Sequence, residues 1–372
     1  MYKRIITEKT PLSEKVKKII TYYRVNRGAT ISWKRRHKNV VSLNPKLGRR
    51  LKKHVEQSHR LYWQPLNKNI KYDTLRICGN LSGIADYRII PEEVFRVDIE
   101  PSLNRDSFAS FYSNKSYYDL WCPGGIFPKS YLHNLDGVWL DSNFNRISML
   151  QIESIASTLP YPVVVKPNKD SHGGSNIYFV NDAEELLTII EHMSNVLVQE
   201  KIKQHHYFAQ FNSKGINSLR VYVYRSVVDN RLHILKTALR MGKGGSLDNE
   251  TAGGIVTFVK GDGYLNGFAL DKYGVKYFSH PDTKADFISK IPDYFGLTQL
   301  AINVASKIFY ARLIGLDMCY DDRSNWRLLE VNLDSATIRF AQYHGSLFFG
   351  DFTEEVRDYC IANHWILGSS NQ

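Results

Sequence analysis

The sequence predicts an α+β fold with antiparallel sheets, on three observations. Apolar residues recur at helical spacing near the start of the chain, at Val16, Ile19 and Tyr23. Short runs rich in β-branched residues alternate with helical segments through the middle of the chain. Two later runs, LRVYVY at 219–224 and WRLLEV at 326–331, partly alternate apolar and polar residues, which is typical of half-buried antiparallel strands.

The N-terminal part of the chain is expected to hold helices followed by short strands. Residues 12–23 and 51–63 both carry apolar residues at helical spacing. Between residues 72 and 105 the apolar runs are short, and glycine and proline interrupt them at Gly79, Gly83, Pro91 and Pro101. This punctuation predicts short strands and turns that lead into the body of the protein.

A hairpin and a helix are expected next. Residues 161–166 (YPVVVK) and 177–180 (IYFV) are apolar strands on either side of a glycine-rich turn. Asp182 is a suitable N-cap for the helix that follows, with two glutamates in its first turn. Further short strands are predicted at 196–200, 219–224, 234–240, 316–319 and 328–331.

The positive charge of the chain is concentrated at its N-terminal end. The formal net charge is +12, yet residues 1–60 hold 18 Lys and Arg against 3 Asp and Glu, which is +15. The other 312 residues hold 31 against 34, which is −3. Such a basic region could meet nucleic acid, anionic lipid or an acidic polysaccharide, or be no more than a solvated helical face.

Nothing in the sequence predicts a membrane span or a leader peptide. No stretch approaches the roughly 20 apolar residues that cross a bilayer, and the start, MYKRIITEKTPLSEKVKK, lacks an apolar core. We therefore expect a cytoplasmic protein, with room for peripheral contact at the inner membrane. The cysteines lack the spacing of a zinc site or disulfide framework and are expected to be reduced: Cys78, Cys122, Cys319 and Cys360.

One segment has the chemistry of a phosphate site. Lys166 ends an apolar strand just before Gly173, Gly174 and Ser175. A glycine-rich turn exposes backbone N–H groups that can surround phosphate oxygens, and a lysine fixed on a strand adds a point charge. The GK[ST] ending of a Walker A loop is absent. Taken alone, the two glycines equally fit an ordinary tight turn.

A second segment has the chemistry of a magnesium site. Glu330 and Asn332 are two residues apart, so on a strand they project from the same face. If the strand that carries Asp317 pairs beside them, three oxygen-bearing side chains converge, as magnesium prefers when it also binds phosphates. A pair of surface strands with charged outer positions is the ordinary alternative.

Several separated segments together resemble one known family, the ATP-grasp enzymes. Asn114-Lys115 is similar to the segment with the family's first nucleotide lysine, although Asn stands where Asp is usual. Lys166 with residues 172–175 resembles the second nucleotide lysine and the mobile loop over the phosphates. Residues 199–202 (QEKI) resemble the hinge that reads adenine.

Later segments extend this resemblance. Residues 217–221 (NSLRV) look like the family's D-x-R-V strand, and Arg240 begins a segment similar to its R-x-G…D-N…G-G pattern, which includes Asp248-Asn249. Residues 280–283 (HPDT) and 87–91 (YRIIP) are typical of the sugar-transfer-associated branch, found in bacterial polysaccharide gene sets. The resemblance covers roughly residues 70 to 340 in the family's order, and agreement of many motifs is more specific than any one.

The resemblance implies a set of roles for named residues. ATP and Mg²⁺ would be the cofactors, and the metal ligands would be Asp317, Glu330 and Asn332. Arg220 and Arg240 would be the catalytic residues, facing the transferred phosphate or holding an oxyanion or a carboxylate. The nucleotide would be bound by Lys115, Lys166, Gly173, Gly174, Ser175, Gln199, Glu200, Lys201 and Ile202. We expect ordinary structural roles for His172, His205, His206 and His280.

The resemblance also implies an ATP-grasp fold, with two α+β subdomains whose antiparallel sheets grip ATP. The expected parts are a basic helical arm at 1–70, a pre-ATP-grasp region at 71–114, a small lid subdomain at 115–200, and a large subdomain with the metal site at 201–365.

The implied activity is that of an ADP-producing carboxylate–amine ligase that works through an acyl phosphate. The branch implies a uronic acid, joined to an amino acid or amino alcohol in bacterial capsule or other surface polysaccharide biosynthesis. No nucleic-acid partner is expected, whereas residues 1–60 would suit an acidic glycan or the inner membrane surface. Two alternatives stay open: a phosphotransferase acting on a sugar or carboxylate, and a non-catalytic glycan-binding protein of the same fold.

Overall fold

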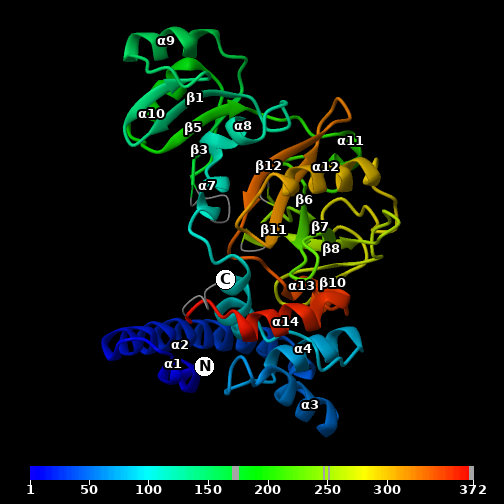
Figure 1. Cartoon of the computed structure of the whole chain (residues 1–372). Helices are drawn as coiled ribbons and strands as arrows, with labels where there is room; N and C mark the ends of the chain where they lie inside the picture. Colours follow the sequence, from blue (N-terminus) through cyan, green and yellow to red (C-terminus); the bar gives the residue numbers. More distant parts are fainter. Residues whose placement is uncertain (170–175, 246–247, 250–251, 368–372) are drawn as a thin grey trace.

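The computed structural model describes residues 1–169, 176–245, 248–249 and 252–367. Figure 1 shows two β-sheet units, with helices from both ends of the chain gathered beside the larger one. Among the described residues, one sheet has five strands in the order β2-β1-β5-β3-β4 and the other has seven in the order β10-β9-β8-β7-β6-β11-β12. Neighbouring strands in both sheets run antiparallel, so the predicted α+β class is confirmed.

The N-terminal region is helical, as predicted, and its main helix is longer than the sequence pattern indicated. The helix α2 begins at Leu12, as expected, but continues to Leu43. It packs beside α1, α4 and α5, and buries Tyr22, His37 and Val40. The elements of this region are α1 (Tyr2–Thr7), α2 (Leu12–Leu43), η1 (Pro45–Gly48) and α3 (Lys53–Trp63).

The prediction of strands between residues 72 and 105 was wrong, because this segment is helical. Gly79 lies inside α4, where an added Cβ would come within 2.9 Å of Leu51, so the glycine permits close packing instead of a turn. Gly83 is the left-handed residue that ends the same helix, with φ of 79°. Pro91 precedes a helix. The elements are α4 (Asp73–Ser82), α5 (Glu92–Val94), the π-helical turn η2 (Phe95–Ile99) and α6 (Glu100–Leu103).

The smaller sheet contains the predicted hairpin and carries two helices. The strands β3 and β4 pair antiparallel, and Asp182 caps α10 by accepting a hydrogen bond from the backbone N–H of Glu185 at 2.9 Å, as expected. Apolar residues of this sheet form a core with α9 and α10. Its elements are β1 (Ser130–Leu135), β2 (Val138–Asp141), α9 (Met149–Thr158), β3 (Val163–Pro167), β4 (Tyr178–Val180), α10 (Ala183–Glu191) and β5 (Val196–Glu200).

The larger sheet is buried on both faces at its centre. In β6, Leu219 and Val221 pack in one apolar core with α12, whereas Tyr222 and Tyr224 pack in a second core with helices from both chain ends. The half-buried pattern predicted for this strand was therefore wrong, and it fits only the edge strand β12. The strands are β6 (Ser218–Arg225), β7 (Leu232–Met241), β8 (Ile255–Val259), β9 (Ala269–Leu270), β10 (Lys276–Tyr277), β11 (Leu313–Tyr320) and β12 (Trp326–Asn332).

Short helices connect and cover the two sheets. In the described residues, no helix is both long enough and apolar enough to cross a bilayer. The remaining elements are α7 (Ala109–Tyr112), η3 (Lys115–Tyr117), α8 (Tyr118–Trp121), α11 (His206–Ala209), α12 (Tyr294–Ser306), α13 (Arg339–Tyr343), η6 (Gly350–Phe352) and α14 (Thr353–Ala362).

Candidate active site

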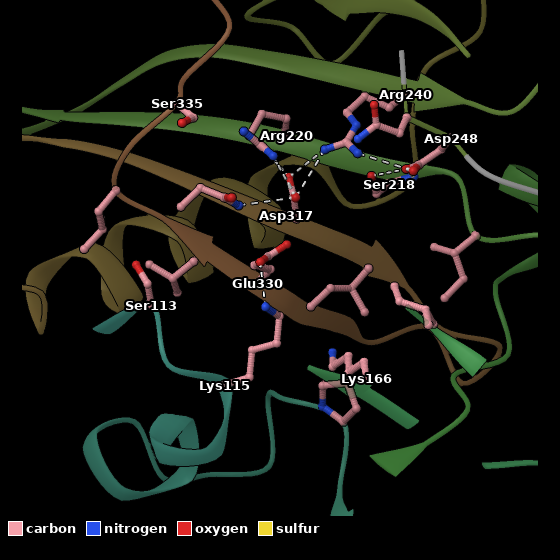
Figure 2. A pocket seen from close by; sticks show the side chains of 18 of the residues that line it. Ser113, Lys115, Lys166, Ser218, Arg220, Arg240, Asp248, Asp317, Glu330 and Ser335 are labelled. Carbon is pink, nitrogen blue, oxygen red and sulfur yellow. Dashed lines mark hydrogen bonds and ion pairs between the residues drawn. The ribbon is translucent and has the colours of Figure 1, made fainter. Parts of the chain in front are cut away.

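A cavity of about 1790 Å³ lies where the two sheets face each other. Side chains of β3 and β5 line it from the smaller sheet, and side chains of β6, β7, β11 and β12 line it from the larger one. Lys166, Asp317, Glu330 and Asn332 all line this cavity, so the two predicted sites are parts of one (Figure 2).

The three predicted metal ligands come together because β11 and β12 pair in the required register. Asp317 is opposite Glu330, and Gly315 is opposite Asn332, with an irregularity in the pairing just after Asp317. The Nδ2 group of Asn332 donates to Oδ2 of Asp317 at 3.3 Å. The amide oxygen of Asn332 is therefore the atom of that side chain that suits a cation.

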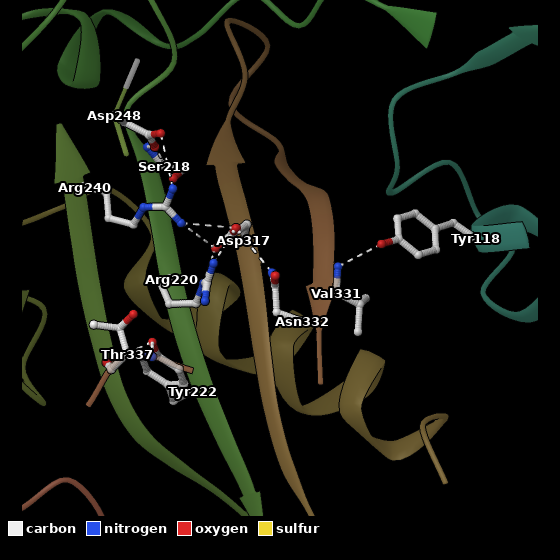
Figure 3. A network of polar contacts seen from close by, with 10 residues as sticks. All are labelled: Tyr118, Ser218, Arg220, Tyr222, Arg240, Asp248, Asp317, Val331, Asn332 and Thr337. Carbon is white, nitrogen blue, oxygen red and sulfur yellow. Dashed lines mark hydrogen bonds and ion pairs between the residues drawn. The ribbon is translucent and has the colours of Figure 1, made fainter. Parts of the chain in front are cut away.

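Two arginines hold Asp317 in the described structure (Figure 3). Arg220, directly opposite on β6, donates from Nε to Oδ1 and from Nη2 to Oδ2 at 2.8 Å. Arg240 of β7 donates from Nη1 to both oxygens, at 3.1 and 3.2 Å. Burial alone would raise the pKa of Asp317, but the positive charges of Arg220 and Arg240 outweigh it and lower the pKa to about 2. Asp317 is therefore ionised at neutral pH.

Asp248 is also part of this network. It lies in a segment that resembles a family motif, but it was not predicted as a site residue. Its carboxylate accepts from Arg240 Nη2 at 3.3 Å and from the backbone N–H of Ser218 at 3.1 Å. The hydroxyl of Ser218 also donates to it. Asp248 therefore orients Arg240 from the side opposite to Asp317. The available signal was its place in the Asp248-Asn249 pair of the arginine segment.

The predicted nucleotide lysines reach the cavity from the side of the smaller sheet. Lys115 Nζ pairs with Oε1 of Glu330 at 2.8 Å, and its backbone N–H donates to the carbonyl of Asn168 at 2.8 Å. Burial, aided by the charge of Lys115, lowers the pKa of Lys166 to about 8. Asn114, where Asp is usual in the family, still accepts the capping hydrogen bond from the N–H of Ser116 at 3.1 Å.

Cations therefore surround a pair of carboxylates in this cavity. Figure 2 shows Lys115 and Lys166 on one side of Glu330, and Arg220 and Arg240 on the far side of Asp317. With two lysines and two arginines against Asp317, Glu330 and Asp248, the site can accept a polyanion together with a divalent cation.

The predicted adenine hinge lines the same cavity at the end of β5. Gln199 is buried, and its Nε2 donates to the carbonyl of Pro128 at 3.3 Å and to Ser130 Oγ at 3.1 Å. Glu200 accepts from Arg327 and from the backbone N–H of Lys129. Both side chains are thus already engaged. Beyond them, Lys201 is exposed and Ile202 is buried.

Other predicted residues lie outside the site or outside the described part of the chain. Gly173, Gly174 and Ser175, with His172, are not among the described residues. His280 is buried and its Nε2 lies 2.9 Å from the carbonyl of Gly242. His205 accepts at Nδ1 from the N–H of Tyr207, and His206 is exposed. The last three histidines have the ordinary surroundings that were expected of them.

The donor set suits magnesium but not a softer metal. Within 1–169, 176–245, 248–249 and 252–367, no cluster of three or more His, Cys, Asp or Glu side chains is placed to hold an ion. Asp317 and Glu330 supply two carboxylates and Asn332 an amide, all hard oxygen donors on paired strands. Magnesium takes such ligands in small number when phosphate oxygens and water complete its shell.

The family of the chain follows from a direct comparison. A family model described as sugar-transfer associated ATP-grasp matches residues 95–348. The chain belongs to this family. The match contains β1 to β12 and every predicted site residue, so in this ATP-grasp chain the cavity lies inside the family's own segment. No curated protein matches the chain.

Solved structures resemble this ATP-grasp chain only remotely. N5-carboxyaminoimidazole synthase from Aspergillus clavatus is 10% identical with a TM-score of 0.40, over 67% of this chain and 52% of that one. L-amino acid ligase from Bacillus licheniformis is 10% identical with a TM-score of 0.38, over 66% and 47%. D-alanyl-alanine synthetase A from Vibrio cholerae is 16% identical with a TM-score of 0.39, over 69% and 66%. This chain thus spans about half the length of the first two.

Proposed function

We propose that this chain is an ATP-dependent carboxylate–amine ligase that works through an acyl phosphate. The observation that carries the proposal is the single cavity in which Lys115, Lys166, Arg220 and Arg240 surround paired carboxylates. Attack of an anionic carboxylate on a polyanionic triphosphate brings like charges together. Catalysis therefore depends on positioning and on neutralisation of charge, which this set of cations supplies.

The two sides of the cavity have different tasks in this proposal. Lys115 and Lys166, on the side of the smaller sheet, bind the phosphates of ATP, and the hinge at 199–202 takes the adenine. Arg220 and Arg240, on the larger sheet, hold the substrate carboxylate against the terminal phosphate. Asp317 and Asp248 keep both guanidinium groups in position before substrate arrives.

The proposed reaction has two steps. A carboxylate oxygen attacks the terminal phosphorus, an acyl phosphate forms, and ADP leaves. An amine then adds to the acyl carbon and loses its proton, the amide forms, and phosphate leaves. The arginines that held the carboxylate are placed to stabilise the oxyanion of this second step.

Asp317, Glu330 and Asn332 are the residues that would hold magnesium. When bound, the ion neutralises phosphate charge and orients the phosphoryl group. In the described structure these carboxylates instead pair with Arg220, Arg240 and Lys115, so the cations and carboxylates exchange partners when ATP and metal bind.

The substrate class is proposed from the family and from the charge of the site. The sugar-transfer association of the family favours a carboxylated sugar such as a uronic acid, joined to an amino acid or amino alcohol in surface polysaccharide synthesis. The paired arginines suit a carboxylate bidentately. The cavity of about 1790 Å³ exceeds the roughly 300–1000 Å³ of a single small-ligand site, which leaves room for a sugar beside the nucleotide.

We also propose a division of the chain into four parts. A helical region at 1–70 and a connecting region at 71–114 precede a small subdomain at 115–200 and a large one at 201–365. The support is that β1 to β5 fall in the small part and β6 to β12 in the large part.

The decisive experiment is a screen for ADP release. Uronic acids are crossed with amino acids and amino alcohols in the presence of Mg²⁺ and ATP, and products are identified by mass spectrometry. A ligase releases ADP only when both partners are present and gives an amide. ADP release without any amine, with a stable phosphorylated product, would instead identify a phosphotransferase. If calorimetry detects no ATP binding, the alternative of a non-catalytic glycan-binding protein would be favoured.

A further inference from the structure

The helix α2 carries a continuous exposed stripe that the proposed ligase chemistry does not use. Eight of its residues follow one another at spacings of three or four, so they lie along one side of the helix. The opposite side is buried through Tyr22 and Val40. We call these eight residues the outer stripe: Leu12, Val16, Ile20, Tyr23, Arg27, Ile31, Lys34 and Lys38.

The outer stripe is apolar toward its start and basic toward its end. Its five apolar members are between 45% and 76% exposed, and its three basic members are exposed as well. On α1, Ile6 is also exposed and lies beside this part of α2, since Lys15 Nζ donates to its carbonyl at 2.8 Å. Exposed apolar side chains clustered in this way mark a contact surface.

The charge of α2 is of one sign over almost its whole length. Residues 15–43 contain nine Lys and Arg and no Asp or Glu. Among the described residues, no carboxylate pairs with Lys17, Arg24, Lys34, Arg35 or Lys38. With a rise of about 1.5 Å per residue, the helix presents this charge from Lys15 to Lys38, over roughly 35 Å. Such a surface attracts an extended anionic partner.

We propose that the outer stripe of α2 binds the surface of an anionic phospholipid membrane. A bilayer interface accepts both halves of the stripe: apolar side chains enter the boundary between headgroups and acyl chains, while lysines and arginines meet the phosphates. A soluble polyanion would satisfy the basic half and leave Leu12, Val16 and Ile20 in water. A second copy of the chain would cover the apolar half and bring two basic helices together, which like charges oppose.

The arrangement of α2 within the fold fits a docking role. The helix is held by packing and by the hydrogen bond from Tyr22 to Asp98 at 2.8 Å, so the stripe is preformed and needs no folding on contact. Figure 1 shows α2 at the end of the molecule away from β1 to β5, so the membrane contact would leave the smaller sheet uncovered.

The test is flotation of the full chain with lipid vesicles, in phosphatidylcholine alone and in equal parts phosphatidylcholine and phosphatidylglycerol. The apolar variant carries Val16→Gln and Ile20→Gln, and its matched control carries Val228→Gln and Ile288→Gln at exposed apolar positions elsewhere. The charge variant carries Lys34→Gln and Lys38→Gln, with Lys260→Gln and Arg323→Gln as its control. Circular dichroism and thermal melting establish that each variant is folded.

We expect the unaltered chain to float with anionic vesicles and not with neutral ones. The apolar and the charge variant should each bind about tenfold more weakly, and both controls should bind normally. Failure to float with anionic vesicles overturns the proposal. Tight binding to a polyuronate or to duplex DNA that the apolar variant retains would show a polyanion site instead. A dimer that the apolar variant converts to monomer would show an interface between copies.

Discussion

At the scale of single residues, the site is governed by which cation neutralises which carboxylate. In the described structure Glu330 pairs with Lys115, and Asp317 is shared by Arg220 and Arg240. Lys166 lines the same cavity with its pKa lowered to about 8, by burial first and by the charge of Lys115 second. In the proposed function these charges change partner when a triphosphate enters, which makes their titration and their substitution informative.

The lowered pKa of Lys166 predicts that ATP binds more weakly as pH rises above about 8. A bound triphosphate favours the charged lysine and raises its pKa, so affinity is full below the free-state pKa and is lost as pH rises through it. Calorimetry between neutral pH and pH of roughly 9.5 measures this, with proton uptake on binding near pH 8. Lys166→Arg should bind with little dependence on pH over this range, because an arginine stays charged.

Removing the charge of Lys166 should weaken ATP binding at every pH. We expect Lys166→Met to raise the dissociation constant for ATP about tenfold or more, since a charge-assisted phosphate contact is lost. Lys260→Met, at an exposed lysine outside the cavity, serves as the control. Equal affinity in Lys166→Met and the unaltered chain would remove Lys166 from the nucleotide site.

The partner exchange at Glu330 predicts opposite effects with and without metal. Glu330→Gln removes a negative charge that faces the phosphates and deprives Lys115 of one partner. Metal-free ATP should therefore bind a few-fold more tightly, whereas the gain in affinity on adding Mg²⁺ should largely disappear. Binding of a fluorescent ATP analogue in chelator and in Mg²⁺ measures both, with the exposed Glu354→Gln as control. An unchanged response to Mg²⁺ would exclude Glu330 as a ligand.

At the scale of elements, the proposed metal site depends on an edge strand. In the described sheet β12 is the last strand, so one side of it lacks a neighbouring strand. The hydroxyl of Tyr118 accepts a hydrogen bond from the backbone N–H of Val331 at 3.0 Å, between Glu330 and Asn332 (Figure 3). The Tyr118 ring stacks on Phe127 at 4.3 Å. This buried tyrosine thus accepts a hydrogen bond from the edge strand at the point where the proposed metal ligands lie.

Tyr118→Phe should therefore destabilise the protein and disturb the metal site. The N–H of Val331 would lose its acceptor in a buried position, which costs about 1–3 kcal/mol of the free energy of unfolding. Chemical denaturation measures this loss, and the Mg²⁺ dependence of nucleotide binding reports the change at Glu330 and Asn332. Tyr310→Phe, at an exposed tyrosine, should change neither. If Tyr118→Phe alters stability alone, the tyrosine supports the fold but does not position the ligands.

The elements also show where sequence patterns are informative and where they mislead. The hairpin of β3 and β4, the Asp182 cap and the strands that carry Arg220 and Asp317 were predicted, because each is recorded in a local apolar pattern or capping residue. The helix α4 was missed because Gly79 looked like a turn residue. A glycine is suitable at this position because Leu51, which lies outside residues 72–105, packs closely against it.

At the scale of the whole molecule, both ends of the chain are built into one base beneath the larger sheet. Asp98 is fully buried and receives hydrogen bonds from Tyr22 of α2 at 2.8 Å and from His364 at 2.9 Å. Ile5 and Ile366 share the apolar cluster around it. The N-terminal helices are therefore packed into the protein, and the basic surface of α2 is held in a fixed orientation.

Tyr22→Phe should lower the stability of the whole protein. A buried hydrogen bond to Asp98 is lost, at a cost of about 1–3 kcal/mol in the free energy of unfolding. The neighbouring Tyr23→Phe is the matched control, because Tyr23 is 49% exposed. Urea denaturation of both variants measures the difference, and ATP affinity should be normal in each. Equal stability of the two variants would mean that α2 contributes little to the common base.

The sequence by itself predicted the candidate site of this ATP-grasp chain: two lysines, two arginines and the set Asp317, Glu330 and Asn332. Agreement of several short motifs with one family was enough, because each motif is a local run of residues that can be recognised without the fold. Only the tertiary structure decided that Arg220 and Arg240 share Asp317, that Asp248 orients Arg240, and that α2 is packed into the protein through Tyr22 and Val40. These contacts join segments far apart in the chain, and their pairing depends on strand register and packing that no local pattern records.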